Sequence, residues 1–240
     1  MFDSRRDQGS GRPQDIKEIC LAAHRSHGFL GGTCGKFLVT YLLFYLLLVL
    51  NRFSISQKIV LENRFKNDKG NDCLLSVEGT DFQRSKTSKD WYSYKFRRSG
   101  LRYEVAVSIL GGDICWICGP WKPGKYNDLD IFREALATWL EPNERVEADD
   151  GYAVEAPMRV KCPASIAEPV ERAAMTQRVR NRHETVNKRF KQWGILRQVF
   201  RHDLANHRNV FAAICVVTQL AIENGEPLFE VHYDDDNVSL

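Results

Sequence analysis

A single carboxylate, Glu184, lies in a strongly basic stretch of the sequence. Between Arg172 and Arg201 there are nine Lys or Arg residues, and Glu184 is the only acid. Cations suit a phosphodiester backbone, and a carboxylate can hold a metal ion against a scissile phosphate. Such chemistry requires partner carboxylates elsewhere in the chain.

Two upstream segments predict strands that end in acids. Residues 73–78 are typical of a strand that stops at Gly79, which would leave Glu78 at the end of the strand. Residues 145–148 form a second short strand, followed directly by Asp149. Strand ends are places where chemistry is often found. Glu78, Asp149 and Glu184 are therefore the candidate catalytic and metal-binding residues.

The types of these side chains indicate which metal they would bind. Carboxylate oxygens without a His/Cys cluster suit a hard cation, hence Mg²⁺ or Mn²⁺ and not zinc. Two such ions, about 3.5–4 Å apart, would flank the attacking and the leaving oxygen. Asp81 is the alternative to Glu78, ranked second because it follows the predicted strand end at Gly79.

Other polar residues have ordinary structural interpretations. Asp150 is expected to serve the turn that follows it. Asn127 or Asp128 is expected to cap a helix. His202 and His207 are placed in a loop and at a helix start, and we assign neither to a metal.

The basic stretch predicts an amphipathic helix over residues 175–193. Its apolar residues recur on one face at 3.6 residues per turn. Arg180, Lys188 and Lys191 fall on the opposite face, within two turns of Glu184. We interpret these three cations as ligands of DNA phosphates. The alternative is a solvated helix face, in which i,i+4 pairs contribute roughly 0.2–0.5 kcal/mol each.

Composition fits one α/β domain with a modest additional segment. The chain has 240 residues, of which 43% are hydrophobic and 27% charged, with a formal net charge of +3. Its seven cysteines have no regular spacing, which favours free thiols in an intracellular reducing compartment. Affinity for nucleic acid would have to come from local clusters of charge.

The remaining elements follow from periodicity and turn residues. Residues 102–109 and 113–118 alternate around Gly-Gly, which predicts an antiparallel hairpin. A helix then begins near Asp128, residues 119–124 and 153–174 are expected to form loops, 195–200 a strand and 207–224 a helix. Three antiparallel strands leading into a βαβ arrangement predict an α/β mixed sheet with flanking helices.

The N-terminal segment, residues 1–58, contains an uncharged apolar run at 37–50. Its 14 residues fall short of the roughly 20 that span a bilayer. A buried or partner-bound helix is therefore the favoured interpretation, with membrane association as the alternative. We place the main domain at 59–236 and a tail at 237–240.

Four sequence motifs resemble the DDE superfamily endonuclease domain of Harbinger-like transposases. They are Ser-Val-Glu-Gly-Thr-Asp-Phe from Ser76, Pro-Gly-Lys-Tyr-Asn-Asp-Leu from Pro123, Ala-Asp-Asp-Gly-Tyr from Ala148 and His-Glu-Thr-Val-Asn-Lys-Arg-Phe-Lys from His183. The resemblance implies a ribonuclease-H-like fold and metal-dependent cleavage and joining of DNA strands. It also implies that Glu78, Asp149 and Glu184 are the metal ligands.

The resemblance also suggests partners and a location. Double-stranded DNA at transposon ends is the implied substrate, and a homo-oligomer and a separate DNA-binding protein are further partners to consider. The nucleus is the implied compartment in a eukaryote. The chain departs from the family in having Glu78 where Asp-Gly-Thr is usual, and no helix-turn-helix is recognisable in residues 1–58. The alternative function is therefore a catalytically inactive relic that binds DNA or a partner.

Overall fold

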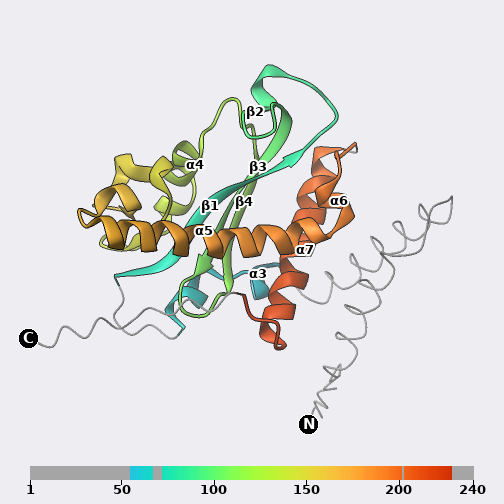
Figure 1. The fold of residues 1–240 in the computed structure, drawn as a ribbon. Coiled ribbons are helices and arrows are strands. Elements are labelled where there is room, and N and C mark those ends of the chain that lie inside the picture. The colour runs from blue at the N-terminus through green and yellow to red at the C-terminus, as the bar shows by residue number, and fades with distance from the viewer. Residues whose placement is uncertain (1–54, 67–71, 202, 229–240) are drawn as a thin grey trace, which may run out of the picture. The chain divides into compact units, whose positions relative to one another are not determined.

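The computed structural model describes residues 55–66, 72–201 and 203–228 (Figure 1). The apolar run at 37–50, His202 and the tail at 237–240 lie outside these residues. Within the described ranges no helix combines the length and apolar character needed to cross a membrane. The predicted boundary at residue 59 falls between a helical turn, α3 (Ile55–Lys58), and a 3-10 helix, η2 (Leu61–Phe65).

A six-stranded mixed sheet forms the centre of the fold. The central strand β1 (Cys73–Gln83) pairs antiparallel with β3 (Arg98–Ser108) on one side and parallel with β5 (Arg145–Glu147) on the other. The other strands are β2 (Tyr92–Ser93) and β4 (Ile114–Trp121), both on β3, and β6 (Val160–Lys161), parallel to β5. The predicted passage from antiparallel to parallel pairing is confirmed.

Strand β1 continues through Gly79, so the predicted strand end there is wrong. Gly79 pairs with Glu104 of β3, and the ladder runs on to Gln83. A side chain at Gly79 would collide with a neighbour, because a Cβ built there lies 1.9 Å from Oδ1 of Asp128. The glycine therefore admits a carboxylate beside the strand and does not terminate it.

The β3–β4 hairpin is confirmed, but β4 extends through Gly119 to Trp121, where a loop was expected. The next helix, α4 (Asp128–Glu134), is capped by Asn127, whose side chain accepts a hydrogen bond of 2.7 Å from the Asp130 amide. Asp130 in turn accepts from the Asn127 amide, which completes a capping box. The cap therefore leaves the Asp128 side chain available for other contacts, and a short 3-10 helix, η4 (Leu136–Thr138), follows.

The loop predicted over residues 153–174 is wrong. This stretch contains the end of η5 (Asp150–Glu155), strand β6, the 3-10 helix η6 (Pro163–Ser165) and the first turns of the long helix α5 (Pro169–Gln192). Pro169 begins α5, where its lack of an amide hydrogen has no cost. Two of the three prolines in this stretch, Pro163 and Pro169, are therefore the first residues of helices, and Pro157 lies in the turn before β6.

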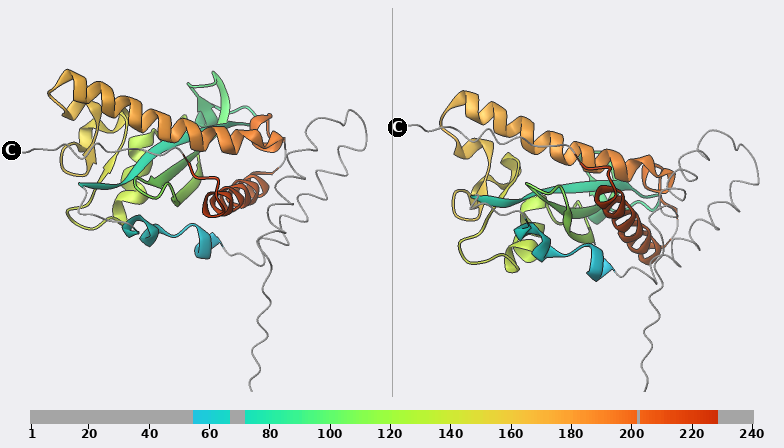
Figure 2. Two further views of the ribbon diagram at one scale, coloured as in Figure 1. Left: turned by 60° about the horizontal axis from the view of Figure 1, so that its bottom comes forward. Right: turned by 90° about the horizontal axis from the view of Figure 1, so that it is seen from below.

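Helix α5 buries the predicted apolar stripe, namely Met175, Val179, Val186 and Phe190. It packs against β1 and α7 (Leu204–Glu223), on the opposite side of the sheet from α3 and η2 (Figure 2). The strand expected over 195–200 is wrong, because residues 194–197 form a helical turn, α6 (Gly194–Arg197). Within that range only Phe200 makes a β-bridge, to Arg84.

The core lies between β1, β5 and α4. It includes Leu75, Val77, Phe132, Leu136 and Val146, all essentially inaccessible to solvent. The five cysteines that the structure describes are free thiols, as expected. Because β1 contributes both to this core and to the site below, the positions of the site residues are fixed by buried packing.

Candidate active site

Glu78 lies in the middle of β1, on the side of the strand that faces α5. Its Oε2 is 3.8 Å from Nδ1 of His183, and its side chain is 28% exposed. Burial raises the pKa of Glu78 to about 7. Lys95 and Lys191 oppose this shift, whereas Asp149 and Asp128 add to it. The three carboxylates therefore lie close enough to feel one another's charge, and we call Glu78, Asp128 and Asp149 the acidic cluster.

Asp128 belongs to this cluster and does not cap α4. Its Oδ1 faces Gly79 and lies 3.2 Å from Nη1 of Arg102. This oxygen is shielded from solvent and has no hydrogen-bond donor among the described residues, although the cation is nearby. Burial raises the pKa of Asp128, Arg102 lowers it, and Asp81 and Asp149 raise it further. A carboxylate oxygen that is shielded from solvent and accepts no hydrogen bond is suited to binding a cation.

Asp149 is the N-cap of η5. Its Oδ1 accepts a hydrogen bond of 2.9 Å from the Gly151 amide. The neighbouring Asp150 instead accepts from the Ala164 amide at 2.8 Å. The role in the turn that was predicted for Asp150 therefore belongs to Asp149. The same cap holds the Asp149 carboxylate at the end of β5, beside the other two acids.

Asp81, the alternative to Glu78, is buried within β1. Arg102 donates to both of its oxygens, at 2.7 and 3.0 Å, and Ser93 Oγ donates at 2.6 Å. A carboxylate with three donors has little capacity left for a metal ion. Asp81 instead positions Arg102, which also faces Asp128, so the structure favours Glu78 over Asp81 as the acid with free oxygens.

Glu184 lies outside the acidic cluster in this structure. Its side chain is 61% exposed and forms an ion pair of 2.6 Å with Arg180, one turn earlier on α5. Among the described residues, no contact joins Glu184 to Glu78 or Asp149. Glu184 nevertheless follows directly after His183, the residue that approaches Glu78. This adjacency is one of sequence alone, because consecutive side chains of a helix point in different directions and Glu184 faces solvent beside Arg180.

The three cations predicted on α5 have different surroundings. Arg180 and Lys188 are both exposed on the helix surface, as a DNA-facing surface requires. Lys191 is only partly exposed, and its Nζ lies 5.9 Å from the centre of the Phe82 ring. Burial lowers the pKa of Lys191, and its charge acts on Glu78. Lys191 therefore belongs to the acidic cluster's surroundings and not to the solvated face of the helix.

His183 is a site residue that the sequence did not indicate. It is buried, and its Nε2 lies 2.8 Å from Oγ of Ser76 on β1. Burial lowers the pKa of His183 to about 3, so the imidazole is neutral. Next to it, Arg182 forms a buried ion pair of 3.1 Å with Glu147 on β5. Together the two contacts fix the orientation of α5 against two adjacent strands of the sheet.

The donor set fits a hard divalent cation. In the part of the chain that the structure describes, no three His, Cys, Asp or Glu side chains already converge on one metal position. The acidic cluster nevertheless offers only oxygen ligands, one of them without a hydrogen-bond donor, and its acids disfavour one another's charge. A divalent ion would relieve this repulsion, and Mg²⁺ or Mn²⁺ is the kind of ion that carboxylates select.

Comparison with protein families decides what kind of domain this is. The sequence model of the DDE superfamily endonuclease matches residues 77–219, more than half of the chain. The chain belongs to this family. No curated protein matches the chain, and no solved structure does.

The matched region starts in β1 and ends in α7, so it contains the acidic cluster and Glu184. The resemblance noted from the four motifs is confirmed at the level of this family. Its ribonuclease-H-like α/β fold agrees with the mixed sheet and flanking helices. As a DDE superfamily endonuclease domain, the chain is of the transposase type of nuclease.

Proposed function

We propose that this domain cleaves and joins DNA strands with the help of Mg²⁺ or Mn²⁺ ions held at the acidic cluster. The proposal rests on Glu78, Asp128 and Asp149, which come from three separate elements and lie near enough for the charges of Asp128 and Asp149 to raise the pKa of Glu78, in addition to the effect of burial. Carboxylates whose pKa is raised by burial and by neighbouring acids are common at functional sites. Glu78 and Asp149 would hold the ions, with Asp128 as an additional oxygen donor.

Glu184 would complete the ligand set by turning away from Arg180. An exposed ion pair of this kind contributes little to stability, because water screens it and ordering two long side chains has an entropic cost. A divalent cation beside Glu78 would attract Glu184 more strongly. Because Glu184 now faces solvent beside Arg180, joining the cluster would require a movement of its side chain and of α5 around it.

The surrounding residues suit phosphoryl transfer. Bound metal ions would supply Lewis-acid activation of the scissile phosphate and of the attacking water or DNA 3′-hydroxyl. Lys95 and Lys191, whose charges reach Glu78, would stabilise negative charge on the phosphate oxygens as the bond breaks. Arg102 keeps Asp81 and Asp128 in place. Arg180 and Lys188 would contact backbone phosphates outside the cluster.

Nicking of supercoiled plasmid by the full chain, with and without Mg²⁺ or Mn²⁺, tests the proposal. The matched control is Asp149→Asn, which keeps a side-chain oxygen for the cap of η5 and removes the ligand charge. Metal-dependent nicking by the natural chain and its loss in Asp149→Asn would support the proposal. DNA binding without nicking in either metal would instead favour the inactive relic, for which the longer Glu78 side chain in place of aspartate is the supporting observation.

A further inference from the structure

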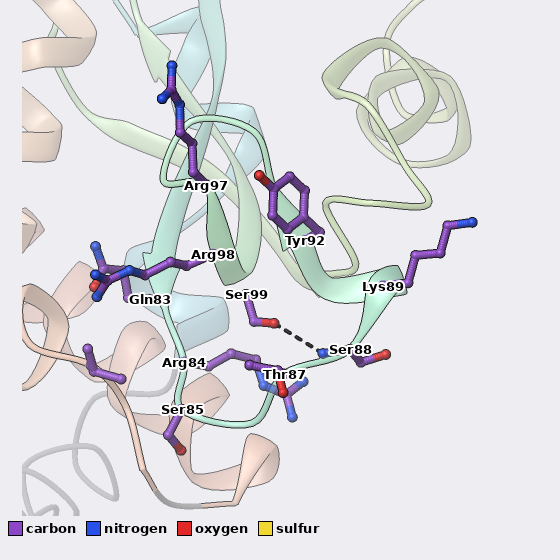
Figure 3. A pocket seen from close by; sticks show the side chains of 11 residues that line it. Gln83, Arg84, Ser85, Thr87, Ser88, Lys89, Tyr92, Arg97, Arg98 and Ser99 are labelled. Carbon is purple, nitrogen blue, oxygen red and sulfur yellow. Dashed lines mark hydrogen bonds between the residues drawn. The ribbon is translucent and has the colours of Figure 1, made fainter.

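A second feature of the molecule is a pocket beside the loop between β1 and β3. It has a volume of about 540 Å³ and lies at the end of β1 remote from the core. Four cationic side chains line it, with four Ser or Thr residues between them, and no carboxylate is among its lining residues. The four cations are Arg84, Lys89, Arg97 and Arg98. We call this the basic pocket (Figure 3).

Arg84 is the residue in the basic pocket whose hydrogen bonds are incomplete. Its guanidinium lies over the Trp91 ring, 4.5 Å from the ring centre. Its Nη1 is shielded from solvent and has no acceptor among the described residues. Burial also lowers the pKa of Arg84, which shows that the cation is disfavoured where it stands. A buried donor without an acceptor is costly, and an anion would remove that cost.

The other cations of the pocket are also without carboxylate partners. Among the described residues no ion pair joins Lys89, Arg97 or Arg98 to an acid, whereas nearby Asp90 pairs with Lys122 at 3.2 Å. In Figure 3, Lys89 and Arg97 extend at opposite rims, while Arg84 reaches toward Thr87. The cationic hydrogen-bond donors of the basic pocket are therefore spread along it, an arrangement that suits an extended polyanion.

Arg97 ends the turn that joins β2 to β3. Its φ is +52°, and it is the non-glycine residue with positive φ among those the structure describes. A left-handed residue of this kind is a feature of tight turns. The turn places this arginine at the rim of the basic pocket.

Two further observations favour nucleic acid over a free anion. Tyr92, which lines the pocket, makes an edge-to-face contact of 5.2 Å with Tyr94, whose exposed fraction is 82%. Exposed aromatic rings among cations suit the sugars and bases of nucleic acid. In addition, Lys95 of the same loop acts on Glu78, so this loop borders both the basic pocket and the acidic cluster.

We infer that the basic pocket binds backbone phosphates of the DNA on which the acidic cluster acts. Arg84 lies six residues beyond Glu78 along the line of β1, which corresponds to about 20 Å at roughly 3.3 Å per residue. This length matches about six base-pair steps of duplex at roughly 3.4 Å each. One DNA segment can therefore reach both sites. The inference rests on the proposed function for its choice of ligand, but binding alone tests it.

The test measures the affinity of the full-length chain for a short DNA duplex as a function of salt, by fluorescence anisotropy without divalent metal. Arg84→Gln and the double variant Arg97→Gln with Arg98→Gln remove the pocket's cations. The matched control, Arg197→Gln with Arg208→Gln, removes two exposed arginines that do not line the pocket. Plasmid nicking in Mn²⁺ is measured on the same proteins.

Each pocket variant is expected to weaken binding and to flatten the plot of log affinity against log salt by about 0.9 for every phosphate that is no longer neutralised. The control should keep the natural slope. The inference is overturned if the pocket variants bind like the control, if the natural chain does not bind duplex, or if inorganic phosphate displaces DNA at equal phosphate concentration. Weakened binding by the variants supports it even when no protein nicks, so failure of the nuclease proposal is seen separately.

Discussion

The acidic cluster and Glu184 differ in how firmly the fold holds their side chains. The acidic cluster is held by packing: Gly79 makes room for Asp128, the cap of η5 holds Asp149, and burial raises the pKa of Glu78 to about 7. Glu184 on α5 is instead exposed and paired with Arg180.

Under the proposed function, this difference would divide metal binding and chemistry between the acidic cluster and Glu184. The acids of the cluster would attract a cation even without DNA. The exposed Glu184 would join when the ion and DNA arrive, because only a weak surface pair must be broken. Substitutions in the two regions should therefore affect metal binding and cleavage in different proportions.

Asp149→Asn should have the largest effect. Asn preserves an oxygen acceptor for the Gly151 amide, so the thermal midpoint should stay within a few degrees of the natural protein. Loss of the charge should reduce both Mn²⁺ affinity and plasmid nicking, the latter by more than about 100-fold. A variant that nicks at the natural rate would remove Asp149 from the metal site.

Glu184→Gln should reduce nicking by about 10- to 100-fold, a reduction comparable with that from a single misplaced catalytic group. Its effect on Mn²⁺ affinity, measured by calorimetry without DNA, should be small because the acids of the acidic cluster remain. Arg180→Gln breaks the same ion pair and keeps the acid, so it should lose only a phosphate contact and nick faster than Glu184→Gln. Natural nicking by Glu184→Gln would show that the exposed acid has no part in the chemistry.

Glu78→Asp should increase nicking by about 10-fold in Mg²⁺. The shorter side chain moves its oxygens by about one bond length, and Mg²⁺ tolerates little departure from octahedral geometry. In Mn²⁺ the nicking rates of the natural chain and of Glu78→Asp should differ less than in Mg²⁺. Glu78→Gln, which has the length of Glu without the charge, should nick less than either. No gain with Glu78→Asp would mean that Glu78 does not limit the rate.

Glu104→Gln should change stability and leave nicking nearly unaltered. Glu104 is buried on β3 beside Trp116, and burial raises its pKa to about 7. The folded state therefore holds a proton that the unfolded state releases near pH 4.5, so stability falls as pH rises from about 4.5 to about 7.

Glu104→Gln should therefore reduce this pH-dependent loss of unfolding free energy by up to about 3 kcal/mol. Urea unfolding at about pH 5 and about pH 8 measures the difference. Some decline should remain, because the pKa of Glu78 is raised in the same direction. An unchanged difference between the two pH values would show that Glu104 does not titrate in this range. Glu104→Gln thus shows the effect of a buried acid that has no role in the proposed site.

Local patterns in the sequence determined much of the fold. The stripe of Met175, Val179, Val186 and Phe190 predicted the buried face of α5, and Asn127 was expected as a helix cap. The four motifs indicated the family and the ribonuclease-H-like fold. These features depend on residues a few positions apart, where periodicity, capping and turn chemistry act directly.

Tertiary structure decided the details of the site. The sequence suggested that Gly79 ends a strand and that Asn127 or Asp128 caps a helix, whereas the fold makes Gly79 and Asp128 neighbours. It gave no sign that His183 approaches Glu78, or that Arg84 stands over Trp91 with a donor unused. Burial and the field of other charges arise from segments far apart in the chain, and these set the pKa and the contacts of a carboxylate. Residue types and spacing therefore determined which acids were candidates, but only their packing decided which of them feel one another's charge.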